Sequence, residues 1–128
     1  MKAGKEEIVG LMAAVRWYLD LDHAALMQTC EDQVATVLRA FANTPGVQAR
    51  RSFPNEAGQP MPRAELLIDE AALGISRDAI LEQLMNGDPA VSLAPSPDNG
   101  VYINPQTLRP GEEHIVIERI KEILEKRI

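Results

Sequence analysis

The sequence predicts an α+β fold in which helices pack on one face of an antiparallel four-stranded sheet. All nine prolines among the 128 residues lie between Pro45 and Pro110, which leaves both ends of the chain free for long helices. Between these prolines, short apolar runs bounded by Pro and Gly are typical of strands, and they come in two pairs. Strands grouped in hairpins, with helices segregated from them, favour an α+β arrangement. The predicted order of elements is α-α-β-β-α-β-β-α.

Two helices are predicted ahead of the first proline. In residues 5–19, apolar side chains recur at spacings of three and four, which predicts an amphipathic helix with a stripe made of Ile8, Leu11, Met12, Val15 and Leu19. Asp22 is a suitable N-cap for a second helix, and "NTPG" at residues 43–46 ends it. The apolar face of the second helix consists of Leu26, Cys30, Val34, Val37, Leu38 and Phe41.

Two pairs of strands and two more helices follow. The first pair is "VQARRSF" (47–53) and "RAELLID" (63–69), and Ser76 is the predicted N-cap of the helix after it. The second pair is "AVSLAP" (90–95) and "GVYINP" (100–105), because Asn99-Gly100 favours a tight hairpin turn. Pro110 suits the first turn of the last helix. That helix is predicted to bury Val116 or Ile117, Ile120, Ile123 and Leu124.

Composition and charge exclude several classes of function. The net charge is -6, from 19 acidic and 13 basic residues, whereas a nucleic-acid-binding domain normally presents a basic face. No uninterrupted apolar run approaches the length of a membrane span, and no basic-then-apolar signal region precedes a small-residue cleavage site. The chain is therefore predicted to be cytoplasmic, with neither nucleic acid nor membrane among its partners.

Residues suited to catalysis or metal binding are few. No nucleophile motif, phosphate-cradling glycine loop or metal-binding motif occurs. The single cysteine, Cys30, is predicted to be a small buried hydrophobe, and His23 and His114 lack a Cys or a second His at metal-ligand spacing. The four lysines lie in the terminal helical segments, where charge is usually solvated. We therefore predict no catalytic residue, no metal site and no cofactor-binding residue in this chain.

The arginines are the most informative charged residues. Arg50, Arg51 and Arg63 fall on or beside predicted strands, where an arginine is usually a solvated, outward-facing residue. Arg109 stands immediately before Pro110 at a helix entrance, so it combines a bidentate donor with the free N–H groups of a helix start. That combination makes Arg109 the candidate substrate-binding residue, and a plain surface residue at the helix entrance is the alternative.

Two stretches of the sequence resemble one family of enzymes. "MKAGKEEIVGLMAAVRWYLDLD" is similar to the long helix that leads from the large to the small domain of selenocysteine-synthase-like pyridoxal-phosphate enzymes, a family of fold type I. The matching residues are Gly4, Lys5, Ile8, Gly10, Leu11, Ala14, Tyr18 and Leu19. "GVYINPQTLRPGEEHIVIERIKEIL" resembles the end of the small C-terminal domain. The family includes L-seryl-tRNA selenium transferase and D-glucosaminate-6-phosphate ammonia-lyase-type proteins, and the "LRPGEE" spelling is closer to the second branch.

The resemblance implies a domain division and a function. Residues 1–21 would be a linker helix that follows a missing large domain, and residues 22–128 would be the small C-terminal α+β domain. The large domain would hold pyridoxal phosphate and its lysine, so this chain would be inactive alone and would help to close the active site and to form a homo-oligomer. The full enzyme would be a lyase or transferase acting on a small amino acid or amino sugar acid. In fold-type I enzymes a small-domain arginine grips the substrate carboxylate, a role that the resemblance gives to Arg109.

Two other classes of protein fit the same residues. One is a free-standing module that binds a small molecule at the sheet. The other is a structural module that dimerises through its first helix. An upstream reading frame coding for the large domain would favour the enzyme fragment over both.

Overall fold

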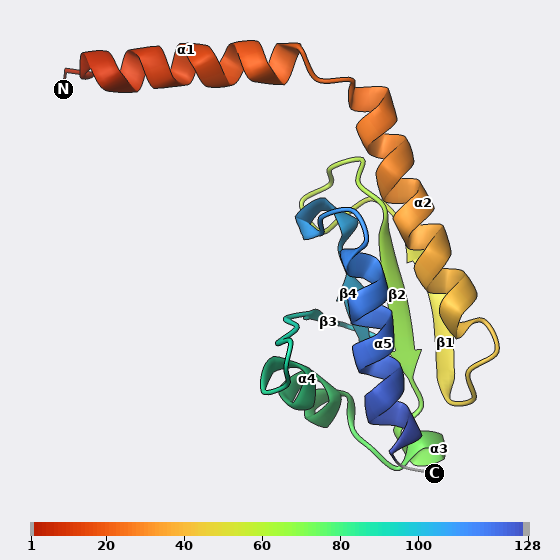
Figure 1. Ribbon diagram of the computed structural model, residues 1–128. Helices are drawn as coiled ribbons and strands as arrows, with labels where there is room; N and C mark the ends of the chain where they lie inside the picture. The colour runs from red at the N-terminus through yellow and green to blue at the C-terminus, as the bar shows by residue number, and fades with distance from the viewer. Residues whose placement is uncertain (1, 127–128) are drawn as a thin grey trace.

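Five α-helices, four strands and one 3-10 helix make up residues 2–126, the part of the chain that the computed structural model describes (Figure 1). The helices are α1 (Lys5–Leu19), α2 (His23–Phe41), α3 (Glu70–Leu73), α4 (Arg77–Met85), η1 (Pro105–Thr107) and α5 (Glu112–Glu125). The strands are β1 (Val47–Ser52), β2 (Arg63–Ile68), β3 (Ala94–Ser96) and β4 (Gly100–Ile103). The predicted α+β class and order of elements are confirmed, with the short helices α3 and η1 as additions.

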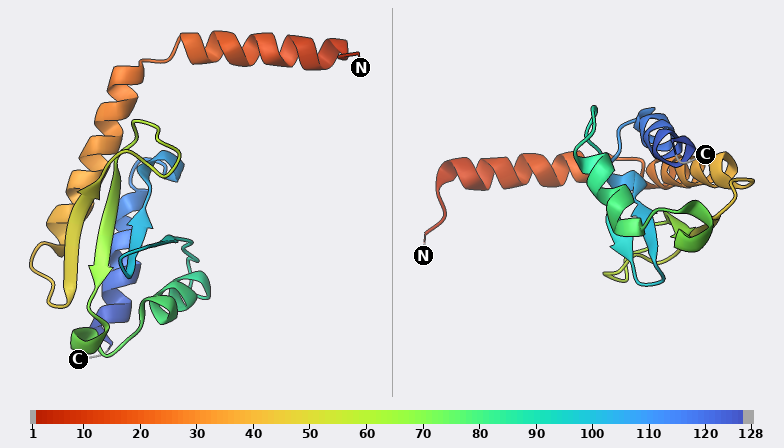
Figure 2. Two further views of the ribbon diagram at one scale, coloured as in Figure 1. Left: turned by 180° about the vertical axis from the view of Figure 1, so that it is seen from behind. Right: turned by 90° about the horizontal axis from the view of Figure 1, so that it is seen from below.

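The four strands form one antiparallel sheet in the order β1-β2-β4-β3. Helices α2 and α5 lie side by side over one face of this sheet, and the view from behind shows the opposite face free of them (Figures 1 and 2). The central strand β2 alternates accordingly, since Ala64, Leu66 and Ile68 belong to the core whereas Arg63 and Glu65 belong to the opposite face. This uncovered side is called the open face below.

The core lies between the helices and the covered face of the sheet. Helix α5 contributes its predicted apolar stripe, and both Val116 and Ile117 are buried. Helix α2 contributes Val34, Val37 and Phe41 from its C-terminal half, whereas Leu26 near its start is 47% exposed. Close packing of these side chains supplies most of the hydrophobic stabilisation. The other core residues are Ala64, Leu66, Ile68, Ile75, Ile80, Leu84, Val91, Val101, Ile103, Ile120, Ile123 and Leu124.

Most predicted helix boundaries are confirmed. The side chain of Asp22 accepts a hydrogen bond from the Ala25 N–H (2.9 Å), and the side chain of Ser76 accepts one from the Ala79 N–H (3.1 Å). The start of α5 differs, because its N-cap is Gly111 at φ 90°, a conformation that glycine adopts readily. Pro110 therefore lies ahead of the helix, and its predicted place in the first turn was wrong.

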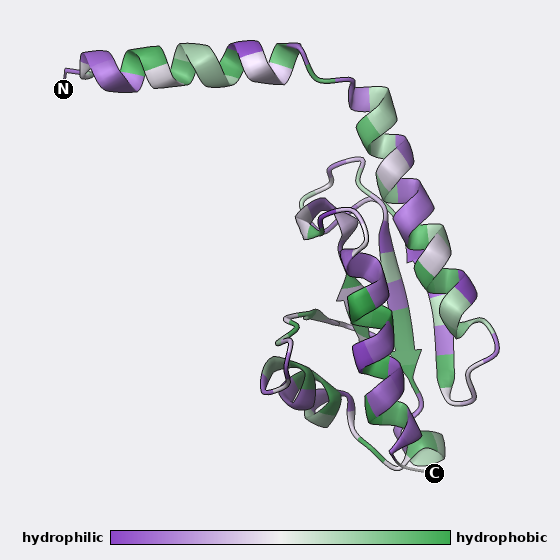
Figure 3. Ribbon diagram, in the orientation of Figure 1, coloured by the Kyte–Doolittle hydropathy of each residue, from purple (hydrophilic) through white to green (hydrophobic). Residues whose placement is uncertain are grey.

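Helix α1 projects away from the rest of the chain and contributes no buried residue (Figure 1). A short link, Asp20 to Asp22, joins it to α2 at a sharp change of direction. Its stripe residues Ile8, Leu11, Met12, Val15 and Leu19 are 48%, 67%, 55%, 48% and 71% exposed. Apolar residues thus run along a helix that has no buried residue (Figure 3).

Candidate functional site

Arg109, the predicted substrate-binding residue, is exposed in the connection between η1 and α5. Its backbone N–H donates to Glu112 Oε1 (2.7 Å), and its carbonyl accepts from the Glu112 N–H (3.0 Å). The Glu112 carboxylate therefore lies beside the positive end of α5, where a bound anion was expected. Within residues 2–126 no hydrogen bond is recorded for the Arg109 guanidinium, so it is available to a ligand or to water.

A cavity of about 770 Å³ occupies the angle between α1 and the rest of the chain and is called the elbow cavity here. Trp17 and Tyr18 from α1, Leu26 from α2, and Met61 and Leu108 from two loops are among its lining residues. The Tyr18 ring packs on the His23 ring with centroids 4.6 Å apart, and the His23 Nε2 lies 3.1 Å from the Tyr18 carbonyl oxygen. The apolar lining of this cavity therefore runs from α1 across the link onto α2 and two loops, and it includes Leu108 and Pro110 on either side of Arg109.

An ion-pair network links the first two strands on the open face of the sheet. Arg50 on β1 pairs with Glu65 on β2 and with Asp98, whose Oδ2 lies 2.8 Å from Arg50 Nη2. Glu65 is only 2% exposed, because the strands on both sides of β2 surround it. Arg51 alternates to the side of the sheet that α2 covers, where it donates through Nε to Glu31 on α2 (3.0 Å). This pairing holds the pKa of Glu31 below its usual value. Arg50 and Arg51 are partly exposed, as predicted.

Arg63 does not fit the prediction of a solvated strand residue, because it is only 6% exposed. Its guanidinium lies over the Tyr102 ring, with Cζ 3.7 Å from the ring centroid, and Nη1 pairs with Glu56 from the loop between β1 and β2. A second cavity, of about 530 Å³, is lined by Arg63, Glu56, Tyr102, Leu93 and Ile115. The sequence did not predict the burial of Arg63, because that burial depends on Tyr102. Tyr102 lies 39 positions further along the sequence but on the adjacent strand.

A buried carboxylate connects the two helices that cover the sheet. Glu113 in the first turn of α5 is 9% exposed and accepts a hydrogen bond from Gln33 Nε2 on α2 (3.1 Å). Burial alone would raise the pKa of Glu113. Hydrogen bonds from its own N–H, from Gln33 and from the Gly111 N–H outweigh burial, so the pKa of Glu113 is lowered. The contact stabilises the packing of α2 on α5 and leaves Glu113 ionised near neutral pH.

The remaining candidate groups are the cysteine and the lysines. Cys30 is half-buried rather than buried, and burial, followed by the charge of Glu31, raises the pKa of its thiol. Lys2, Lys5 and Lys126 are exposed and Lys121 is partly exposed, so none fits the desolvated site that a pyridoxal-phosphate lysine needs. Within residues 2–126, no three His, Cys, Asp or Glu side chains are grouped to hold a metal ion, and no helix is long and apolar enough to cross a membrane.

Comparison with known proteins shows that the chain matches a small domain of a larger enzyme. The solved structure of a D-glucosaminate-6-phosphate ammonia-lyase superposes with a TM-score of 0.79 at 26% identity, over 99% of this chain and 34% of that one. The predicted resemblance to enzymes of the ammonia-lyase type is therefore confirmed.

Two curated relatives show the same partial coverage. A 5'-C-glycyluridine monooxygenase-decarboxylase from Streptomyces sp is 28% identical over 126 residues, 97% of this chain and 31% of the relative. The D-glucosaminate-6-phosphate ammonia lyase of Salmonella typhimurium is 28% identical over 127 residues, 98% of this chain and 33% of the relative. The chain thus spans about a third of the length of the curated relatives it matches. No family model matches it.

Proposed function

We propose that residues 22–128 are the small C-terminal domain of a pyridoxal-phosphate-dependent lyase or transferase, and that residues 1–21 are the linker helix from its large domain. The observation that carries this proposal is the coverage: each relative matches this chain almost from end to end with only about a third of its own length. The exposed stripe of α1 and the elbow cavity supply the apolar surface that such a large domain would cover.

The chain's own part in the reaction is to bind and enclose the substrate. Pyridoxal phosphate, held by a lysine of the large domain, would supply the electron sink for bond cleavage next to the substrate amino group. The exposed guanidinium of Arg109 would contact the carboxylate or phosphate of a small amino acid or amino sugar acid as the domains close in the cytoplasmic enzyme. Packing of the small domain against the large one would exclude water, and the apolar surface of α1 would contribute to a homo-oligomer.

The proposal predicts that activity requires both parts. The 128-residue chain alone is expected to release no ammonia from D-glucosaminate 6-phosphate and to form no borohydride-reducible bond with pyridoxal phosphate. Fused behind the other two-thirds of the Salmonella ammonia lyase, it is expected to restore elimination above the level of those two-thirds alone. Ammonia release measures both results. A folded fusion that binds the cofactor but remains as inactive as the truncated enzyme would contradict the proposal.

Arg109 is tested in the same fusion by Arg109→Lys, which keeps the charge but removes the planar pair of donors. A bidentate pair with an anion contributes about 1.5–3 kcal/mol, so KM is expected to rise roughly ten- to a hundredfold. Arg63 cannot serve as the control because it is buried. Arg39→Lys on the exposed side of α2 is the better match, and it should leave KM unchanged. Equal kinetics in the two variants would make Arg109 a surface residue.

A further inference from the structure

Arg63 is a buried cation, and one of its hydrogen-bond donors is unpaired. The guanidinium is buried against Tyr102, yet its Nε has neither a hydrogen-bond partner nor exposed surface. A buried donor without an acceptor costs about 1–3 kcal/mol, so an unpaired nitrogen on a buried cation needs an explanation. Arg63 also lines the cavity of about 530 Å³, so part of this buried cation faces a space that a ligand could occupy.

The carboxylate that pairs with Arg63 is that of Glu56, and this side chain is largely exposed to solvent. Glu56 pairs with Nη1, but the Glu56 side chain is 73% exposed on the loop between β1 and β2, whereas that of Arg63 is 7% exposed. An exposed carboxylate gains little from such a pair, since water can replace the contact at small cost. The position of Glu56 nevertheless shows that a carboxylate fits against this guanidinium.

The rest of the cavity suits a small organic molecule. Leu93, Leu108 and Ile115 provide apolar wall, and Asn104 and Thr107 provide neutral polar groups next to it. Glu112 adds a second carboxylate to the lining, beside that of Glu56. A cavity with apolar walls and a few polar groups is the usual form of a small-molecule site. The Tyr102 ring covers one face of the planar guanidinium, so an anion approaches it in the plane of its N–H donors. Inorganic phosphate could pair with those donors too, but it has no apolar part to lie along Leu93 and Ile115.

We propose that this cavity is a binding site for a small organic acid, and that Glu56 is an internal competitor for it. The carboxylate of the ligand replaces that of Glu56 on Nη1 of Arg63, while the apolar part of the ligand lies along Leu93 and Ile115. All the lining residues belong to the 128-residue chain and Arg109 is not among them, so the site can be tested without the proposed large domain.

The test is binding of butyrate to the full chain at constant ionic strength, followed by NMR shifts of the Arg63 Nε–H and the Tyr102 ring. Wild type is expected to bind weakly. Glu56→Gln removes the competing charge from an exposed position, so the fold should persist and butyrate should bind at least about tenfold more tightly. Arg63→Lys in the same background should abolish the gain. Butyramide, the neutral analogue, should not bind, and inorganic phosphate should bind more weakly than butyrate.

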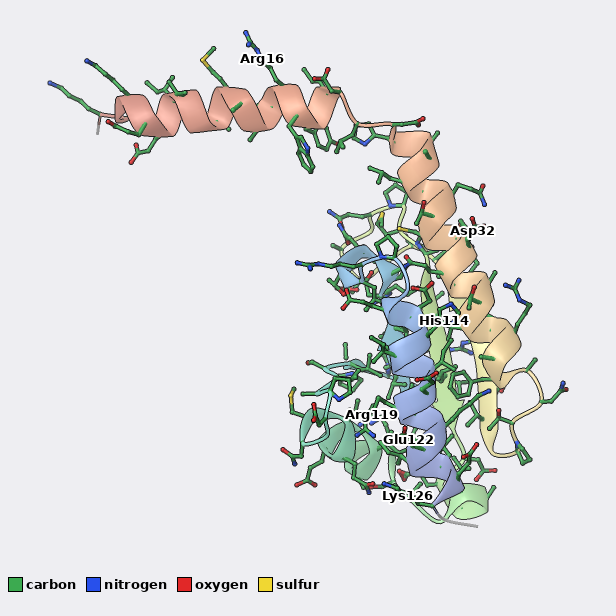
Figure 4. The ribbon with its side chains drawn as sticks, viewed as in Figure 1. Arg16, Asp32, His114, Arg119, Glu122 and Lys126 are labelled. Atoms are coloured by element: carbon green, nitrogen blue, oxygen red, sulfur yellow. The ribbon has the colours of Figure 1, made fainter. Side chains whose placement is uncertain are left out.

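A matched control is available on α5. Arg119 also has a buried, unpartnered Nε and also pairs with an exposed carboxylate, Glu122, one turn further along the helix (Figure 4). Arg119 does not line the cavity, so Glu122→Gln should leave butyrate binding at the wild-type level. The proposal is overturned if Glu56→Gln binds butyrate no better than wild type or Glu122→Gln, if the gain survives Arg63→Lys, or if phosphate binds as tightly as butyrate.

Discussion

Replacing Gly100 by alanine is expected to lower the free energy of unfolding by about 3 kcal/mol, the upper end of the usual cost of overpacking. Gly100 begins β4 and pairs with Leu67 on β2 and with Ser96 on β3. An added Cβ would lie 2.5 Å from the Leu66 carbonyl oxygen and 2.7 Å from Ser96 Oγ, closer than real Cβ contacts come. The carbonyl oxygen belongs to the backbone of the central strand, so the clash can be relieved only by separating strands.

Urea unfolding followed by far-UV circular dichroism measures this cost, and Gly10→Ala is the matched control. Gly10 lies in the interior of α1, where an added Cβ meets nothing within 4 Å. Alanine favours a helix there by up to about 1 kcal/mol, and α1 is not part of the core, so the main transition should stay at the wild-type midpoint. If Gly100→Ala and Gly10→Ala unfold at the same urea midpoint, the prediction is wrong, and the strands accommodate the added methyl group without losing stability.

The isolated chain is expected to self-associate through α1, and Leu11→Glu is expected to weaken that association at least about a hundredfold. The stripe exposes five large apolar residues on one side of the helix, and contiguous apolar surface of more than a few hundred Å² is rare on monomers. A glutamate in the middle of the stripe would place a charge in the contact. Sedimentation velocity over a range of concentrations gives the dissociation constant.

Ala13→Glu is the control for this association. Position 13 lies about 200° around the helix from Leu11, so the new charge faces away from the stripe. Its dissociation constant should remain close to that of the wild type. A wild-type chain that stays monomeric at the highest concentration would show that the apolar surface of α1 does not pair two copies, and it would weaken the case for a homo-oligomer.

Local sequence patterns were sufficient to predict most of the helices, strands and turns of the fold. The caps at Asp22 and Ser76 and the hairpin turn at Asn99 are properties of a few adjacent residues, and each occurs as predicted. Strand β3 begins at Ala94 rather than at residue 90, because the apolar run before it packs on the core and lines the cavity without joining the sheet. The four-residue helix α3 was not predicted, because it directly follows the strand pattern of β2 and is too short to show a helical periodicity.

The candidate sites depend on contacts that no local pattern contains. Arg109 was found because a helix entrance is visible in the sequence, but the occupation of that entrance by Glu112 depends on the conformation of Gly111. Arg63 was interpreted as a solvated strand residue, since the ring beneath it and the carboxylate beside it come from another strand and from a loop. Both cavities are likewise lined by segments that are remote in sequence.

The isolation of α1 has a consequence for how it folds. A 15-residue helix with no buried residue is marginal in water, because the backbone entropy lost in forming it nearly cancels its hydrogen bonds. Opening of α1 therefore costs little, and its amide hydrogens should exchange fast while those of β2 and α5 exchange only on global unfolding. Whatever surface covers α1 must supply the ordering free energy as it binds, so docking and helix formation are one coupled step whose affinity is reduced by that cost.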